Sequence, residues 1–133
     1  MTAKDAIGTV YLIHISPDLH YTGWTEDLET RLAQHRATGW VEYPEPVTLA
    51  DGRKCKGHKT GDGATLLGVA NARGLDWSVS RIWEGSRAVE RRIKNWKGSR
   101  PLCPICSGMA AYNRGNFDTP EHDPAQYQTA GGR

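Results

Sequence analysis

Apolar residues recur at every second position near the start of the chain. Residues 8–15 alternate between two sets of side chains and are rich in β-branched and aromatic types, as is typical of a β-strand. Residues 16–19, Ser-Pro-Asp-Leu, supply turn chemistry, and His20 begins a second β-rich segment. We therefore predict a β-hairpin in which Tyr11 and Tyr21 lie on adjacent strands.

The next segment has the spacing of an amphipathic helix. Thr25 is a suitable N-terminal cap, and the helix is expected to continue to about Ala37, before Gly39. At about 100° per residue, Arg31 and His35 fall beside the apolar positions of this helix. We expect both side chains at the border of the buried face, one turn apart.

Weaker patterns predict the elements that follow. Residues 66–70 indicate a short helix that ends at Gly74, and residues 76–84 alternate as a strand. Ser86 can cap a third helix that runs through Trp96. The alternation of the strand places four of its side chains on one face: Trp77, Val79, Arg81 and Trp83.

The length of 133 residues fits one domain, and periodicity alone predicts a mixed α and β fold. We place the domain in residues 1–106, with a loop insertion at about 40–60 that includes a small hairpin at Asp51-Gly52. Residues 107–133 contain little to bury, so we expect a disordered C-terminal tail.

Composition narrows the class of protein. The net charge is only +2, from 17 basic and 15 acidic residues, so a nucleic-acid partner must be argued from local clusters of charge. The sequence shows no run of roughly 18 apolar residues and no signal-peptide pattern, so we expect a cytoplasmic protein without membrane contact. Three cysteines argue against a disulfide framework and leave metal binding or burial as their roles.

Five polar residues could meet on one face of the predicted sheet: Tyr11, Tyr21, Arg31, His35 and Glu90. Hydrolysis of a phosphodiester requires a group that orients water, positive charge for the developing phosphorane, and usually a hard cation. Each residue has an ordinary alternative, because tyrosines pack in sheets and Glu90 can pair with Lys94 one helical turn away. Taken together, the five residues offer each part of such a site.

The motifs around these residues resemble those of the GIY-YIG nuclease family. Thr9-Val10-Tyr11 and Tyr21-Thr22-Gly23 are similar to the family's paired motif, with threonine and valine in place of its glycine and isoleucine. The segments that carry Arg31 with His35, and Glu90, resemble the helices that follow. Gly-x-Gly-Ala-x-Leu-Leu at 61–67 and Cys-Pro-x-Cys at 103–106 are similar to small stand-alone bacterial members. The resemblance spans roughly residues 8–37 and 61–106.

The resemblance implies a fold and a set of roles. The expected fold is α+β, with a small, mostly antiparallel three-stranded sheet flanked by helices. Tyr11 would activate or position the attacking water with help from Tyr21, Arg31 and His35 would contact the scissile phosphate, and Glu90 would bind Mg²⁺ or Mn²⁺. One carboxylate can suffice, because Mg²⁺ keeps several waters and takes substrate oxygens as ligands. The family's asparagine after this glutamate has no assigned counterpart.

Basic residues cluster in two regions. Around the third helix, four of them are expected to bind nucleic-acid phosphates: Arg87, Arg91, Lys94 and Lys97. The insertion carries Arg53, Lys54, Lys56 and Lys59. The alternative is that these charges only solvate the surface.

A second metal site is suggested by the cysteines. Cys103 and Cys106 form a Cys-x-x-Cys hook, and Cys55 and His58 form a Cys-x-x-His hook that could complete a structural Zn²⁺ site. Burial of reduced cysteines is the alternative. The histidines at 14, 20 and 122 show no partner pattern and receive no role.

These observations predict a metal-dependent endonuclease that hydrolyses nucleic acid, with DNA favoured over RNA. The sequence shows no appended DNA-reading module, so weak specificity, structure selectivity and a targeting protein partner all stay open. Two other classes remain: a non-catalytic nucleic-acid-binding protein on the same fold, and a zinc-clipped interaction module.

Overall fold

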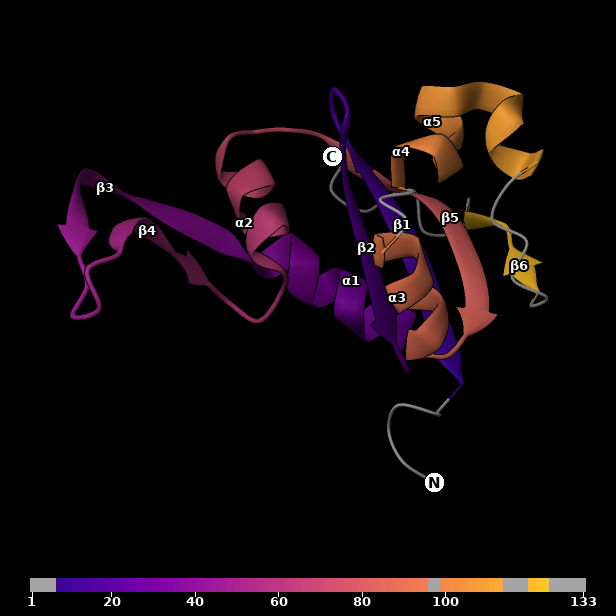
Figure 1. Ribbon diagram of the computed structural model, residues 1–133, viewed down its shortest axis with the longest axis horizontal. Helices are drawn as coiled ribbons and strands as arrows, with labels where there is room; N and C mark the ends of the chain where they lie inside the picture. Colours follow the sequence, from indigo (N-terminus) through magenta and orange to yellow (C-terminus); the bar gives the residue numbers. More distant parts are fainter. Residues whose placement is uncertain (1–6, 96–98, 114–119, 125–133) are drawn as a thin grey trace.

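A four-stranded antiparallel sheet forms the centre of the structure, a computed structural model that describes residues 7–95, 99–113 and 120–124. Its strands lie in the order β2-β1-β5-β6 (Figure 1) and comprise β1 (Gly8–Ile15), β2 (Leu19–Thr25), β5 (Trp77–Gly85) and β6 (Glu121–His122). The fold is mixed α and β with antiparallel sheets, as predicted. The main sheet has four strands rather than three because the two-residue strand β6 adds to the edge of β5.

Strands β1 and β2 form the predicted hairpin. Tyr11 pairs with Gly23, and His14 pairs with His20. Because side chains on a strand alternate between faces, Tyr11 and Tyr21 share one face of the sheet, whereas His14 and His20 share the other. The hairpin therefore presents a different pair of functional groups on each side.

A β-bulge in β5 divides the side chains of that strand between the two faces. The register with β1 shifts between Leu12 and Ile13, where Ser80 is the extra residue and its hydroxyl donates to the Leu12 carbonyl at 3.2 Å. Trp77, before the bulge, packs in one core cluster, and Trp83, beyond it, packs in the other. The expectation that residues 77, 79, 81 and 83 share one face is wrong, because one inserted residue reverses the alternation.

Two helices cover the face that carries the tyrosines. They are α1 (Leu28–Ala37) and α2 (Thr65–Ala72), and their buried apolar residues join the core cluster of Tyr11. The N-cap of α1 is Asp27 rather than the expected Thr25, because the Asp27 carboxylate accepts from the Thr30 backbone N–H at 3.2 Å. The positions of Arg31 and His35 one turn apart on this helix agree with the prediction.

Among the described residues after β5, four short helices lie on the side of the sheet that carries the histidines: α3 (Arg87–Asn95), α4 (Ser99–Leu102), α5 (Pro104–Ser107) and the 3₁₀ helix η2 (Gly108–Asn113). Ser86 caps α3 as predicted, with its hydroxyl accepting from the Ala88 N–H at 3.2 Å. Trp96, the predicted end of α3, lies outside the described residues. Among the described helices, none has both the length and the apolar content needed to cross a bilayer.

The predicted loop insertion is a long β-hairpin, formed by β3 (Gly39–Thr48) and β4 (Lys54–Thr60). The hairpin extends away from the main sheet, and only its base lies beside α2 (Figure 1). The turn falls where Asp51-Gly52 predicted it, and Gly52 adopts a positive φ of 89°. Most side chains of both strands are exposed, so the alternation of apolar residues that predicts strands is missing.

Part of the segment expected to be a disordered tail is ordered. Glu121, in β6, forms a bidentate ion pair with Arg81, whose side chain is almost fully buried, at 2.6 and 2.7 Å. The same guanidinium donates to the carbonyls of Leu102 and Ala111. A buried charge requires such partners, which explains why β6 pairs with β5.

Candidate active site and candidate metal centre

Three aromatic side chains meet on the face of the sheet beneath α1. The Tyr11 hydroxyl lies 2.8 Å from Nε2 of His35, and this hydrogen bond is buried. The Tyr21 ring lies 6.1 Å from the Tyr11 ring and 5.4 Å from the His35 ring, measured between centroids. The structure therefore brings together three of the predicted catalytic residues.

The backbone fixes the tautomer of His35. The Ala64 N–H donates to Nδ1 of His35 at 3.1 Å. A neutral imidazole carries a single N–H, so with Nδ1 accepting, Nε2 holds the proton and donates it to the Tyr11 hydroxyl oxygen. Burial, with a smaller contribution from the charge of Arg31, lowers the pKa of His35 to about 4. The imidazole is consequently neutral at neutral pH.

The two tyrosines differ in their access to solvent. Burial raises the pKa of the Tyr11 hydroxyl well above its usual value of 10.0, the neighbouring Tyr21 adds to the rise, and Arg31 acts in the opposite direction. Tyr11 therefore keeps its proton and, because its oxygen accepts from His35, can donate onward. Tyr11 is fully buried, whereas Tyr21 is only partly buried. Of the two, Tyr21 is the residue that water can reach.

A short connection between β4 and α2, residues 61–64, holds the functional groups of α1. The Asp62 carbonyl accepts from Nη1 of Arg31 at 2.8 Å, and the Ala64 N–H orients His35 as described. Gly63 is needed for this approach, since a Cβ there would lie 2.8 Å from the His35 Cα. This contact gives a physical reason for the Gly-x-Gly-Ala motif.

Gly23 has a similar role in the hairpin. A Cβ at this position would lie 2.5 Å from the Tyr11 hydroxyl oxygen and 2.9 Å from the Tyr21 ring. Both distances are far below van der Waals contact, so a glycine is required where the two tyrosines converge. The glycine of the Tyr-Thr-Gly motif is thus explained by space rather than by backbone conformation.

Glu90 lies on α3 and is connected to the aromatic group through Lys94. Its carboxylate accepts an ion pair from Nζ of Lys94 at 3.0 Å, and the same Nζ lies 5.9 Å from the centre of the Tyr21 ring. The Glu90 side chain is 18% exposed. Within the described residues, Glu90 belongs to no cluster of three or more metal-binding side chains. The structural alternative, an i,i+4 ion pair, is therefore present.

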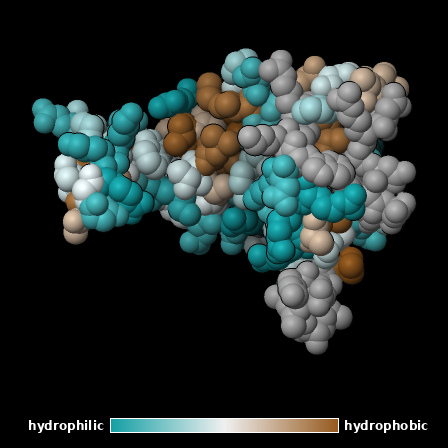
Figure 2. Space-filling view, viewed as in Figure 1, coloured by the Kyte–Doolittle hydropathy of each residue, from teal (hydrophilic) through white to brown (hydrophobic). Residues whose placement is uncertain are grey.

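The predicted phosphate-binding residues are divided in their surroundings. Arg87, Arg91 and Lys94 are all exposed on α3, and the Arg87 guanidinium also stacks over the Trp24 ring at 4.6 Å. Lys97 lies outside the described residues. Hydrophilic residues dominate the surface over α3 and over the far end of the β3–β4 hairpin (Figure 2).

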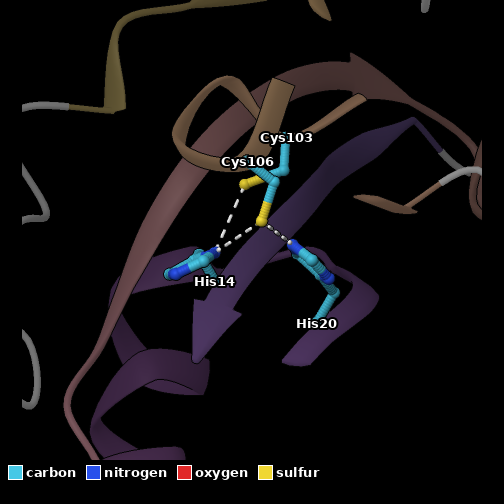
Figure 3. Close-up of side chains that lie close together, drawn as sticks. All are labelled: His14, His20, Cys103 and Cys106. Carbon is cyan, nitrogen blue, oxygen red and sulfur yellow. Dashed lines mark hydrogen bonds between the residues drawn. The ribbon is translucent and has the colours of Figure 1, made fainter. Parts of the chain in front are cut away.

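A second group of side chains meets on the opposite face of the sheet: His14, His20, Cys103 and Cys106 (Figure 3). Their nearest nitrogen and sulfur atoms all lie within 4.8 Å of one another, and the group could hold a metal ion. His14 and Cys103 are buried, and the other two are partly buried. Two of these residues, the histidines, received no role from the sequence.

The predicted zinc partners of Cys103 and Cys106 are elsewhere. Cys55 and His58 lie in β4, on the extended hairpin, and they do not join the cluster. His58 instead bonds to the Tyr43 hydroxyl at 2.9 Å, and the Cys55 thiol donates to the Gly57 carbonyl at 2.9 Å. Cys103 and Cys106 were predicted correctly as members of the cluster, whereas Cys55 and His58 were wrongly chosen as their partners. Sequence spacing cannot show which distant residues lie close to the Cys-x-x-Cys motif in the fold.

No family model, curated protein or solved structure matches this chain. The candidate functional residues of the chain lie in three groups. These groups are the aromatic residues and Arg31 under α1, the Glu90 carboxylate on α3, and the histidines and cysteines on the other face of the sheet.

Proposed function

We propose that the chain is a metal-dependent endonuclease of the GIY-YIG type, which hydrolyses phosphodiester bonds of nucleic acid, with DNA favoured over RNA. One observation carries the proposal: the buried hydrogen bond between Tyr11 and His35, with Tyr21 and Arg31 beside it. A core does not need a directed chain of titratable groups, and burying them is unfavourable unless each is satisfied.

The geometry supports a division of roles. His35 donates a hydrogen bond to Tyr11, and the Tyr11 hydroxyl can in turn donate to Tyr21. Tyr21 is the partly exposed member of this series of hydrogen bonds. Tyr21 would orient the attacking water, while Tyr11 and His35 hold its hydroxyl in position. Arg31 would place positive charge beside the phosphate, where charge develops in the transition state. In this scheme the buried Tyr11 acts as a positioning residue.

Glu90 is the proposed ligand of Mg²⁺ or Mn²⁺. A hard cation fits a carboxylate oxygen, and Mg²⁺ commonly takes only one or two protein carboxylates with waters and phosphate oxygens. When bound, it polarises the phosphate and stabilises the leaving oxygen. On binding the metal, the Glu90 carboxylate would release Lys94, and the lysine could then contact the nucleic-acid backbone.

The exposed basic residues of α3 would bind phosphates without reading the base sequence. Arg91 and Lys94 lie on the same helix as Glu90, so nucleic acid held there passes the proposed metal ligand. The β3–β4 hairpin adds Lys54 and Lys56 at a distance from the main sheet. Sequence or structure selectivity would then come from a targeting protein partner or from the shape of the substrate.

A non-catalytic nucleic-acid-binding protein is the second candidate. The observation that favours it is the Glu90–Lys94 ion pair, because it satisfies the one carboxylate that the nuclease requires. This alternative predicts salt-dependent binding without cleavage in either metal. It assigns no purpose to the directed hydrogen bonds around His35.

The decisive experiment is plasmid nicking with Mg²⁺ or Mn²⁺ by the wild type and by Glu90→Gln, which keeps the size of the side chain and removes its charge. Glu29→Gln is the matched control, since Glu29 is an exposed glutamate on α1. We expect cleavage by the wild type and by Glu29→Gln, and a loss of at least about a hundredfold for Glu90→Gln.

Equal cleavage by all three proteins would indicate a contaminating nuclease and remove the evidence for Glu90. If none of them cuts duplex, branched or single-stranded substrates, while gel retardation shows binding, the second candidate replaces the first. A chelator control completes the test, because cleavage that persists without divalent metal contradicts the proposed chemistry.

A further inference from the structure

We propose that His14, His20, Cys103 and Cys106 form a tetrahedral Zn²⁺ site that fastens the C-terminal helices to the β1–β2 hairpin. The site lies on the face of the sheet opposite the aromatic group, and it is independent of the proposed nuclease activity. Figure 3 shows the two imidazoles pointing from the hairpin toward the two sulfur atoms.

The distances fit zinc. With Zn–S bonds of about 2.3 Å and Zn–N bonds of about 2.0–2.1 Å, a tetrahedral ion separates sulfur from nitrogen by about 3.6 Å. Both sulfur atoms lie 3.5 Å from Nδ1 of His14, and the Cys106 sulfur lies 3.3 Å from Nε2 of His20. Three edges of the tetrahedron are therefore nearly at their final lengths.

The donor set selects the ion. Two thiolates and two imidazoles are soft and intermediate ligands, which suit Zn²⁺ and disfavour Mg²⁺ or Ca²⁺. Zn²⁺ would displace one proton from each cysteine, and its two positive charges would balance the two thiolates. The resulting centre is neutral, which suits a site of which Cys103 and His14 are buried. With four protein ligands the site is closed, so its role is structural.

Each half of the site is held in position by its own element. His14 and His20 are directly opposed on paired strands, which keeps their rings on one face with centroids 5.2 Å apart. Cys103 is the N-cap of α5, and its carbonyl accepts from the Ser107 N–H at 2.8 Å. Both pairs of ligands are therefore held in position by the fold before the ion binds.

The C-terminal segment needs such a fastening. Helices α4 and α5 have four residues each, far fewer than a helix needs to be stable alone. Among the described residues that follow α3, Leu102, Cys103 and Ala111 are the buried apolar ones, which is little core for the described part of this segment. A metal that joins residues more than 80 positions apart restricts the unfolded chain strongly.

The test uses the full chain without a histidine tag, purified under reducing conditions without chelator, and measures bound metal by elemental analysis. Cys55→Ser is the matched control, because Cys55 lies in β4 and outside the cluster. We expect about one zinc per chain in the wild type and in Cys55→Ser, and a decrease of at least about tenfold in Cys106→Ser. Loss of zinc in Cys55→Ser, with zinc retained in Cys106→Ser, would overturn the proposal.

Two measurements on the wild type keep the test decisive if the variant does not fold. Cobalt added to the metal-free protein is expected to give the intense visible bands of a tetrahedral site and a thiolate charge-transfer band, both abolished by zinc. Alkylation mapped by mass spectrometry is expected to modify Cys55 first, and Cys103 and Cys106 only after chelation. A folded, reduced protein that holds no zinc, gives no tetrahedral cobalt spectrum, or contains a Cys103–Cys106 disulfide would refute the site, whatever its cleavage activity.

Discussion

The contacts of His35 lead to a quantitative prediction about pH and stability. Replacement of His35 by glutamine is the informative change, because the glutamine amide can still donate to the Tyr11 hydroxyl but does not titrate. The Ala64 N–H would lose its acceptor, so the variant is expected to be less stable at neutral pH. The dependence of its stability on pH is the quantity of interest.

The sign follows from the pKa values. The pKa of His35 is about 4 in the folded chain, compared with 6.5 for an unperturbed histidine. Between these values the unfolded chain binds a proton that the folded chain does not, so the free energy of unfolding decreases as the pH falls. This contribution is complete above pH 6.5 and is lost toward pH 4. The gap of about 2.5 limits the effect to about 3 kcal/mol.

Urea unfolding at about pH 7.5 and about pH 5 provides the measurement, with wild type and variant at the same metal content. Between these two values, His35 contributes a decrease of about 2 kcal/mol in the unfolding free energy of the wild type. His35→Gln lacks this term, so the decrease is expected to be smaller in the variant by about that amount. Other titrating groups contribute equally to both proteins and cancel in the comparison.

An equal decrease in the two proteins would refute the reasoning. It would mean that His35 accepts a proton while folded, and therefore that Nδ1 is not committed to the Ala64 N–H. The tautomer, and with it the direction of the hydrogen bond to Tyr11, would then have to be reassigned.

Three further predictions test the contacts around the two sites. Gly23→Ala is expected to displace Tyr11 and to destabilise the chain by roughly 1–3 kcal/mol, measured by urea unfolding. An unchanged stability would show that the hairpin backbone can shift to accommodate the added methyl group. Asn71→Ala removes the donor to the carbonyls of His35 in α1 and of Thr38, the C-cap of α1, and a loss of roughly 1–3 kcal/mol is expected from thermal unfolding; a loss of only a few tenths would contradict this prediction. Glu121→Ala leaves Arg81 without its carboxylate, so faster hydrogen exchange is expected in β5, with Glu121→Gln intermediate; unchanged exchange would show that β6 does not stabilise the sheet.

Local patterns predicted most of the main sheet and its helices. The alternation in residues 8–15, the turn residues after it and the helical spacing of Arg31 and His35 act over short distances, and the structure agrees with each of them. The bulge at Ser80 has no such pattern, because it arises only when β5 is aligned with β1. The turn of the β3–β4 hairpin was predicted at Asp51-Gly52, but the length of its strands was not, because most of their side chains are exposed.

The candidate metal centre was half predictable. The Cys-Pro-x-Cys hook is visible in the sequence, but its partners lie more than 80 residues away and had to be chosen by spacing. The hairpin register held the missing information: a turn centred on Pro17 sets His14 directly opposite His20. Two histidines paired across a hairpin are a stronger signal than two separate histidines, because they share a face at a fixed distance.

Strand β1 links the two candidate sites through its register. It lies between β2 and β5, and its pairing with β2 sends Tyr11 to one side and His14 to the other. One residue added to the turn at 16–18 would move both members of β2, His20 and Tyr21, to the wrong sides at once. The length of this turn therefore determines the geometry of both candidate sites, and a single insertion there would disrupt the aromatic group and the metal centre together.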